Sequence, residues 1–239
     1  MSALLPGDRL HARLGAFQRR VARAHDLIAR ALAQMQQPYV AWSGGKDSTV
    51  VLALVREQRP DIPAIWFDDE LEYPETVTYL TETAAALAID LRPMFGTAQH
   101  GGWFTPWTDR PFWRESLPGT ARLGPDYGAR EGWDGGFIGL RAQERPYRAV
   151  HLRARGVLYQ TSAGQWRCNP IADWSLHDVW AYLAQSSMPS NPVYDRLTAI
   201  DIPRELQRVG PLPLTPGWIL AAGWPDLYRK LVTRYGMRW

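Results

Sequence analysis

Short apolar runs and stretches with helix-spaced apolar residues alternate over the first hundred positions of this chain. Three runs suit buried strands, because each is short, mostly apolar and bounded by polar or turn residues; they cover residues 39–42, 62–67 and 89–95. Between them, apolar residues recur every three or four positions and predict helices at about 47–56 and 74–87. This alternation predicts a parallel α/β sheet with right-handed crossovers.

The segment before the first strand has the same helical spacing from residue 10 to residue 35 and predicts one long helix. Its apolar positions are Leu10, Leu14, Phe17, Val21, Ala24, Ile28, Ala31 and Met35. Arginines occupy mostly the other faces, which are either a solvated basic surface or a surface for a second copy or a nucleic acid. Residues 196–239 contain short apolar groups separated by prolines and predict short helices.

These patterns predict an open, mostly parallel, Rossmann-like sheet with helices on both faces and a short helical C-terminal region. We expect a single domain over residues 1–239, in which an N-terminal helix (1–37) precedes the core (38–195) and a C-terminal extension (196–239) follows it.

A polar segment with two adjacent glycines joins the first strand to the helix that follows. It comprises Ser43, Gly44, Gly45, Lys46, Asp47, Ser48 and Thr49. Adjacent glycines let the backbone turn sharply and approach a ligand closely, and the start of the helix presents free N–H groups at its positive dipole end. The hydroxyl groups and the mobile ammonium group of Lys46 add further donors. The segment therefore has the chemistry of a phosphate-binding loop.

Charged residues also follow two other strands, where an open parallel sheet binds its ligands. Asp68 ends the second strand and begins an acidic cluster, which is either a Mg²⁺ or ribose contact or a solvated loop. After the strand residues 137–138, Gly139 precedes Arg141, and Arg148 follows seven positions later. Two guanidinium groups near a strand end are suited to clamping a phosphate or sulfate.

The composition limits the kind of protein. The chain has 239 residues, 46% of them hydrophobic and 21% charged, with a formal net charge of +3, which is typical of a soluble globular protein with a sizeable core. Its single cysteine, Cys168, excludes an internal disulfide framework and a cysteine-rich zinc or iron–sulfur site. No apolar stretch approaches membrane-spanning length and no signal-peptide pattern is present, so we expect a cytoplasmic protein without a membrane partner.

Residues 96–136 break the α/β pattern with many glycines, prolines and tryptophans. The aromatic content argues against disorder. We therefore expect an ordered excursion that walls the pocket of a second substrate.

Five segments resemble known motifs. The loop at residues 43–48 resembles the pyrophosphate-binding loop (PP-loop) of the adenine nucleotide alpha hydrolase superfamily, and later segments resemble the phosphoadenosine phosphosulfate reductase family, including its second-strand segment at Asp68 and Pro74-Glu75-Thr76. The family pattern G-x-R-x-x-(Q/E)-S-x-x-R-A is matched by Gly139, Arg141, Glu144, Arg148 and Ala149, with Arg145 in place of serine. The pattern N-P-(I/L)-x-D-W is matched by Asn169, Pro170, Ile171, Asp173 and Trp174. The pattern N-P-L-Y-D is matched by Asn191, Pro192, Tyr194 and Asp195.

The sequence departs from this family's reductases in two places. The reductases carry a C-terminal E-C-G-(L/I)-H thiol motif, whereas no cysteine follows Tyr194 here and Cys168 has the position of a buried structural thiol. The intact loop at 43–48 is the form found in relatives that cleave ATP between its α and β phosphates. The resemblance therefore implies an enzyme that binds ATP and Mg²⁺, adenylates an anionic acceptor and releases pyrophosphate.

In that interpretation Lys46, Asp47, Arg141 and Arg148 are catalytic, Gly139 and the loop bind the nucleotide, and Asp47 or Asp68 holds the metal. Two alternatives stay open. One is a sulfonucleotide reductase or sulfotransfer enzyme that uses an external thiol or another sulfur donor. The other is a non-catalytic nucleotide-binding subunit of a DNA-modifying complex, which would need a protein partner. A homodimer is also compatible with the sequence.

Overall fold

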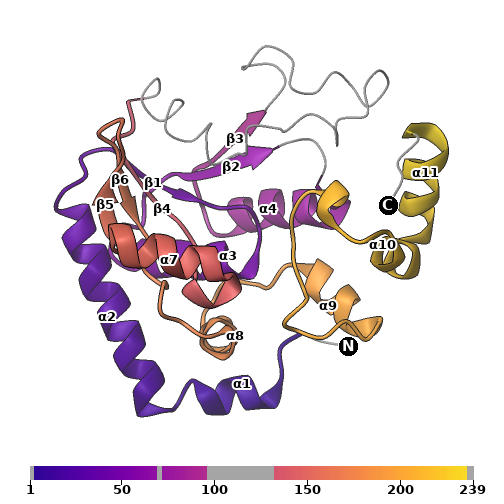
Figure 1. The fold of residues 1–239 in the computed structure, drawn as a ribbon, viewed down its shortest axis with the longest axis horizontal. Helices are drawn as coiled ribbons and strands as arrows, with labels where there is room; N and C mark the ends of the chain where they lie inside the picture. The colour runs from indigo at the N-terminus through magenta and orange to yellow at the C-terminus, as the bar shows by residue number, and fades with distance from the viewer. Residues whose placement is uncertain (1–2, 69–71, 96–131, 236–239) are drawn as a thin grey trace.

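A computed structural model describes residues 3–68, 72–95 and 132–235 (Figure 1). The strands within these ranges form one sheet in the order β3-β2-β1-β4-β6-β5. They are β1 (Pro38–Ala41), β2 (Ala64–Asp68), β3 (Leu91–Phe95), β4 (Gly135–Phe137), β5 (Leu158–Gln160) and β6 (Trp166–Cys168). All neighbouring pairs are parallel except β5 and β6, which form an antiparallel hairpin at the edge. The predicted open, mostly parallel sheet with packed helices is confirmed.

The helices of the described ranges are, in chain order, α1 (Pro6–His11), α2 (Gly15–Leu32), α3 (Lys46–Arg56), α4 (Pro74–Ala86), α7 (Pro146–Arg155), α8 (Leu176–Gln185), α9 (Pro192–Ala199), α10 (Gly217–Gly223) and α11 (Pro225–Tyr235), with the short 3-10 helices η2 (Ala142–Glu144) and η3 (Leu212–Leu214). Right-handed β1-α3-β2 and β2-α4-β3 crossovers step in the same direction and place α3 and α4 on one face of the sheet.

The main apolar core lies between this face and the helices. Val50, Leu52 and Leu54 of α3 are fully buried in it, as are Trp174 and Trp180 from the α8 region. A smaller cluster of Tyr39, Ile65, Met94 and Trp133 lies apart from this core. Tyr39 and Ile65 alternate with Val40 and Ala64 of the main core along their strands, so the two clusters occupy opposite faces.

The prediction of one long helix over residues 10–35 is wrong, because the chain forms α1 and α2 with a break between them. Leu14 adopts an extended backbone at the start of α2, and Leu10 and Leu14 are 64% and 51% exposed although their spacing assigns them to the core face. Tertiary contacts fix α1 in another direction: the His11 ring lies 2.8 Å from the Asp178 carboxylate, and the Arg204 guanidinium contacts Asp8 at 2.7 Å.

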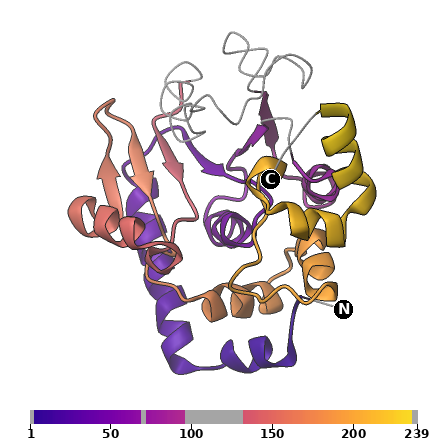
Figure 2. The ribbon, with the colours of Figure 1, turned by 45° about the vertical axis from the view of Figure 1, so that its right-hand side comes forward.

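The C-terminal region forms η3, α10 and α11, which confirms the prediction of short helices separated by prolines. In both views α9, α10 and α11 gather beside α4 (Figure 2). The indole N–H of Trp224 donates to Glu75 of α4 at 2.7 Å, and the Arg196 guanidinium of α9 contacts the same carboxylate oxygen at 2.7 Å. These contacts attach the C-terminal helices to the core.

Two predicted segments lie partly outside the residues that the structure describes. Residues 96–131 of the tryptophan-rich excursion, and Asp69 and Glu70 of the acidic cluster, lie outside the described ranges. No helix within the described ranges is long and apolar enough to cross a membrane.

The start of α8 has a reciprocal cap between Ser175 and Asp178. The Ser175 hydroxyl accepts from the Asp178 N–H at 3.1 Å, and the Asp178 carboxylate accepts from the Ser175 N–H at 2.7 Å. Asp178 is fully buried, and burial raises its pKa, but hydrogen bonds from Arg20, His11 and Ser175 outweigh this and lower the pKa from 3.8 to about 2. This carboxylate therefore links α1, α2 and α8 in its ionised form.

The low pKa of Asp178 predicts how stability depends on pH. A carboxyl group whose pKa is lower in the folded state stabilises the protein above its unfolded pKa, and this contribution is lost as the pH falls through its folded pKa. Between about pH 5 and about pH 2, we expect the free energy of unfolding of the wild type to fall by about 2 kcal/mol more than that of Asp178→Asn. Urea unfolding at several pH values measures this difference. Parallel pH curves for the two proteins would contradict the assignment.

Candidate functional site

The phosphate-loop segment lies between the carboxyl end of β1 and the first turn of α3. Gly44 has a positive φ of 72°, where a side chain is strained, and a Cβ there would lie 3.1 Å from Thr76. Gly45 is the N-cap residue of α3 and has no side chain to accept from the first turn of the helix. The Ser48 hydroxyl donates to the Gly45 carbonyl at 2.9 Å and accepts from the Ser43 N–H at 3.2 Å. The helix therefore opens with donors directed at the sheet edge where ligands bind.

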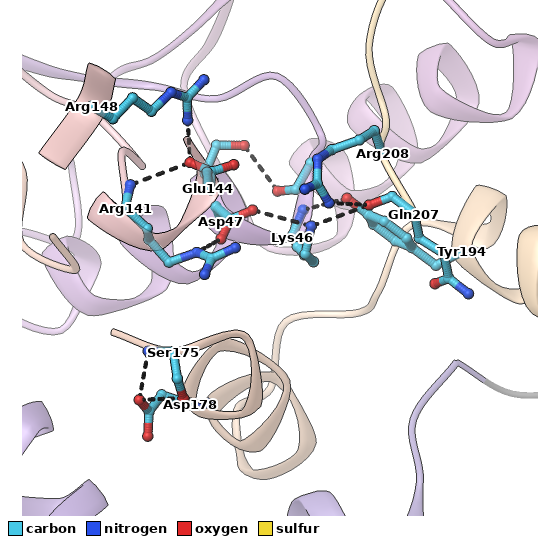
Figure 3. Close-up of polar contacts among 12 residues, drawn as sticks. Lys46, Asp47, Arg141, Glu144, Arg148, Ser175, Asp178, Tyr194, Gln207 and Arg208 are labelled. Atoms are coloured by element: carbon cyan, nitrogen blue, oxygen red, sulfur yellow. Dashed lines mark hydrogen bonds and ion pairs between the residues drawn. The ribbon is translucent and has the colours of Figure 1, made fainter. Parts of the chain in front are cut away.

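A charged cluster occupies the first turn of α3 (Figure 3). One oxygen of the Asp47 carboxylate contacts Nε of Arg141, and the other lies 3.3 Å from Nζ of Lys46. The side chains of Lys46 and Arg141 are 1% and 3% exposed. Burial raises the pKa of Asp47, but the charges of Lys46 and Arg141 outweigh it and leave the pKa below its ordinary value. Burial lowers the pKa of Lys46, and Asp47 opposes this shift.

Two residues of the later N-P-V-Y-D segment fasten the loop. The Asn191 side chain donates to the Gly44 carbonyl at 3.1 Å and to the Thr76 hydroxyl at 3.0 Å, while its own oxygen caps α9. The Tyr194 hydroxyl accepts from the Lys46 backbone N–H at 2.9 Å, and its ring faces the Lys46 ammonium at 5.5 Å. The sequence motif contains both residues, but spacing alone gave no sign that they hold the loop.

Gly139 allows the segment after β4 to approach the start of α3. A Cβ on Gly139 would lie 2.8 Å from the carbonyl carbon of Asp47 and 2.9 Å from the nitrogen of Ser48, both backbone atoms that cannot move aside. This close approach brings Arg141, two residues later, to Asp47. The Gly-x-Arg spacing therefore has a geometric cause.

The structure separates the two arginines that the sequence pairs. Arg141 joins the cluster at α3, whereas Arg148 contacts Glu144 one helical turn before it. Glu144 also accepts from the Arg141 backbone N–H at 3.3 Å, so Glu144 connects Arg148 to the segment that carries Arg141 (Figure 3). Arg148 therefore holds Glu144 in this structure, and Glu144 in turn contacts the backbone of Arg141.

Thr49 has a different environment from the one expected, whereas Asp68 lies at the expected edge of the sheet. The Thr49 hydroxyl accepts from the Trp42 indole N–H at 3.0 Å and lies 3.3 Å from the Tyr79 hydroxyl, so it faces the interior and not the sheet edge. Asp68 ends β2 at the expected edge, and its side chain lies outside the described atoms.

Asp47, a predicted magnesium ligand, has cationic side chains as its partners in this structure. Both of its carboxylate oxygens contact cations, one Nε of Arg141 and the other Nζ of Lys46. Its contacts fit a counter-ion for Lys46 and Arg141.

The sheet order and the position of the loop at the switch in strand order are those of the adenine nucleotide alpha hydrolase fold. The sequence model of the phosphoadenosine phosphosulfate reductase domain matches residues 37–216. The chain belongs to the phosphoadenosine phosphosulfate reductase family.

Curated relatives carry the reductase name. A phosphoadenosine 5′-phosphosulfate reductase of Xanthomonas campestris pv. campestris (strain B100) is 30% identical over 186 residues, which cover 73% of each chain. One from Xanthomonas oryzae pv. oryzae (strain PXO99A) is 30% identical over 207 residues, covering 82% of this chain and 80% of the relative.

Solved structures with two activities share the fold. A phosphate complex of the phosphoadenylyl-sulfate reductase from Candida auris superimposes with a TM-score of 0.60 at 17% identity, covering 84% of this chain and 96% of the other. The FMN adenylyltransferase of Candida glabrata, in complex with FMN and the ATP analogue AMPCPP, gives a TM-score of 0.59 at 18% identity, covering 84% and 65%. At these identities the likeness shows the fold alone.

The contact between Gly139 and α3 predicts the effect of one methyl group. Gly139→Ala forces the start of α3 to shift, so we expect it to weaken binding of a non-hydrolysable ATP analogue at least about tenfold and to lower the free energy of unfolding by about 1–3 kcal/mol. Calorimetric titration and urea unfolding measure the two effects. Gly7→Ala in α1 is the matched control, because a Cβ at Gly7 meets nothing within 4 Å. Equal affinities for Gly139→Ala and Gly7→Ala would contradict this account.

Proposed function

We propose that this protein is an ATP-binding enzyme that cleaves ATP between the α and β phosphates, transfers the adenylyl group to an anionic acceptor and releases pyrophosphate. The observation that carries the proposal is the buried charge at the start of α3. Among the described residues, Lys46 and Arg141 share one carboxylate partner, Asp47, beside a helix start that has no N-cap side chain. A buried excess of positive charge at a helix N-terminus is suited to a phosphate chain.

In this proposal the β and γ phosphates bind at residues 43–48. An acceptor oxygen forms a new bond to the α-phosphorus, the bond from that phosphorus to the bridging oxygen breaks, and pyrophosphate leaves with the electron pair. Lys46 and the N–H groups of α3 stabilise the charge that develops on the leaving group. Arg141 orients the α-phosphate or the acceptor, and Asp47 holds both cations in position.

Magnesium would enter this site with the nucleotide, because Mg²⁺ is usually held by substrate phosphates and water together with one or two carboxylates. Bound there, it would neutralise phosphate charge. Asp68, at the end of β2, remains the candidate carboxylate on the protein.

The burial of Cys168 argues against a reductase that uses this cysteine as its nucleophile. The thiol is fully buried in β6, and burial raises its pKa to about 12, whereas a nucleophilic cysteine needs an accessible thiolate. The Candida glabrata FMN adenylyltransferase has this fold and was solved with the ATP analogue AMPCPP. Its name describes the kind of adenylyl transfer that we propose here.

A second candidate is reduction or transfer of sulfur from a sulfonucleotide by means of a thiol from another protein. The names of the curated relatives favour it. It uses the same anion site, but its nucleotide carries a 3′-phosphate and no β,γ-diphosphate. The third interpretation, a DNA-associated subunit, relied on the arginines of the first long helix. Two of them are engaged within the protein, because Arg20 and Arg23 of α2 pair with Asp178 and Asp173.

Parallel calorimetric titrations distinguish the first two candidates. We expect wild-type protein to bind a non-hydrolysable ATP analogue more tightly than adenosine 3′,5′-bisphosphate. In Lys46→Met, we expect the affinity for the ATP analogue to fall at least about tenfold, because a charge-assisted phosphate contact is lost.

The chain offers a matched control, because its other lysine, Lys230, is exposed on α11. Lys230→Met should bind both ligands as the wild type does. Tighter binding of the bisphosphate would overturn the proposal and support the sulfonucleotide candidate. Full ATP-analogue affinity in Lys46→Met would also overturn it.

A further inference from the structure

A third cation, Arg208 of the C-terminal extension, lies beside Lys46 of the phosphate loop. The backbone carbonyl oxygen of Gln207 accepts from Nζ of Lys46 at 3.4 Å and from Nη1 of Arg208 at 2.9 Å (Figure 3). Two cationic side chains that are distant in sequence therefore meet at one neutral oxygen. The sequence motifs predict no site residue in the C-terminal extension.

Contacts on both sides of Arg208 fix this part of the chain. The Gln207 side chain is 1% exposed and donates to the Thr198 hydroxyl at 3.1 Å and to the Ile202 carbonyl at 2.9 Å. The Arg204 guanidinium contacts the Asp8 carboxylate at 2.7 Å and stacks over Trp180 at 4.5 Å. The position of Arg208 beside the loop is thus a property of the packed core.

Arg208 differs from the other arginines of this region in its partners. Arg196, Arg204 and Arg229 each contact a carboxylate. Among the described residues, the hydrogen bond from Arg208 goes to a neutral carbonyl, and its side chain is exposed. An arginine that is held beside buried cations without a carboxylate of its own has donors available for an anionic ligand.

The charges around the loop do not balance among the residues that the structure describes. Within these ranges Lys46, Arg141 and Arg208 carry three positive charges, and the carboxylate of Asp47 is the one in contact with their charged groups. After burial and the opposing effect of Asp47, the charges of Arg208 and Arg141 are the further influences on the pKa of Lys46, and both lower it. A ligand with at least two negative charges would remove this repulsion.

We propose that Arg208 is a phosphate-binding residue that, with Lys46, binds the terminal phosphates of a polyphosphate nucleotide and makes the site selective for a diphosphate group over a single phosphate. This inference rests on the proposed function and specifies which part of its ligand the C-terminal extension recognises. Ligand oxygens would replace or share the Gln207 carbonyl as acceptors for both cations.

Calorimetric titration with inorganic pyrophosphate, AMP and a non-hydrolysable ATP analogue tests the proposal. We expect Arg208→Gln to weaken pyrophosphate and ATP-analogue binding at least about tenfold and to change AMP binding less than about twofold, because AMP lacks the phosphates that Arg208 would contact. Arg208→Lys should restore part of the pyrophosphate affinity. Arg229→Gln is the matched control for net charge, since that side chain is 71% exposed.

The outcomes separate this inference from the proposed function. Wild-type pyrophosphate affinity in Arg208→Gln, with a loss in Lys46→Met, would overturn the role of Arg208 and leave the proposed function standing. An equal loss for AMP, or an equal loss in Arg229→Gln, would also overturn it. A wild-type protein that binds neither pyrophosphate nor the ATP analogue would overturn both.

Discussion

The Asp47 carboxylate lies between two buried cations at the start of α3, and the rest of the site is arranged around this contact. Buried charges are costly unless they are paired, so the contacts of Asp47 with Lys46 and Arg141 offset the cost of burying these groups. The absence of a side chain at Gly139 permits the approach of Arg141, and Tyr194 accepts the hydrogen bond of the Lys46 N–H. A backbone position and two distant side chains thus serve one electrostatic cluster.

This arrangement connects the fold to the proposed chemistry. The cluster collects residues from the ends of β1 and β4, from α9 and from the C-terminal extension, so no single sequence segment makes the site. Its positive charge exceeds its negative charge, and an anionic ligand would complete it. The same excess would stabilise charge on a departing pyrophosphate, so that binding and catalysis would rely on the same groups.

Much of this organisation is predictable from local pattern. The strand-loop-helix unit at the phosphate loop depends on contiguous residues, and the structure has it where the sequence predicts it. Leu10 and Leu14 were misassigned because the contacts of Asp8 and His11 override helical spacing. The β5–β6 hairpin was missed because its strands are short and lie at an edge. The inward orientation of Thr49 and the position of Arg208 depend on tertiary contacts, which no spacing encodes.

The most direct test of the central claim is a crystal structure of the protein with a non-hydrolysable ATP analogue. The account predicts that the β and γ phosphates lie within hydrogen-bond distance of the backbone N–H groups at residues 43–48 and of Nζ of Lys46, with Asp47 still between Lys46 and Arg141. A complex in which these phosphates lie away from the start of α3, or in which the loop contacts only a single phosphate of the nucleotide, would contradict it.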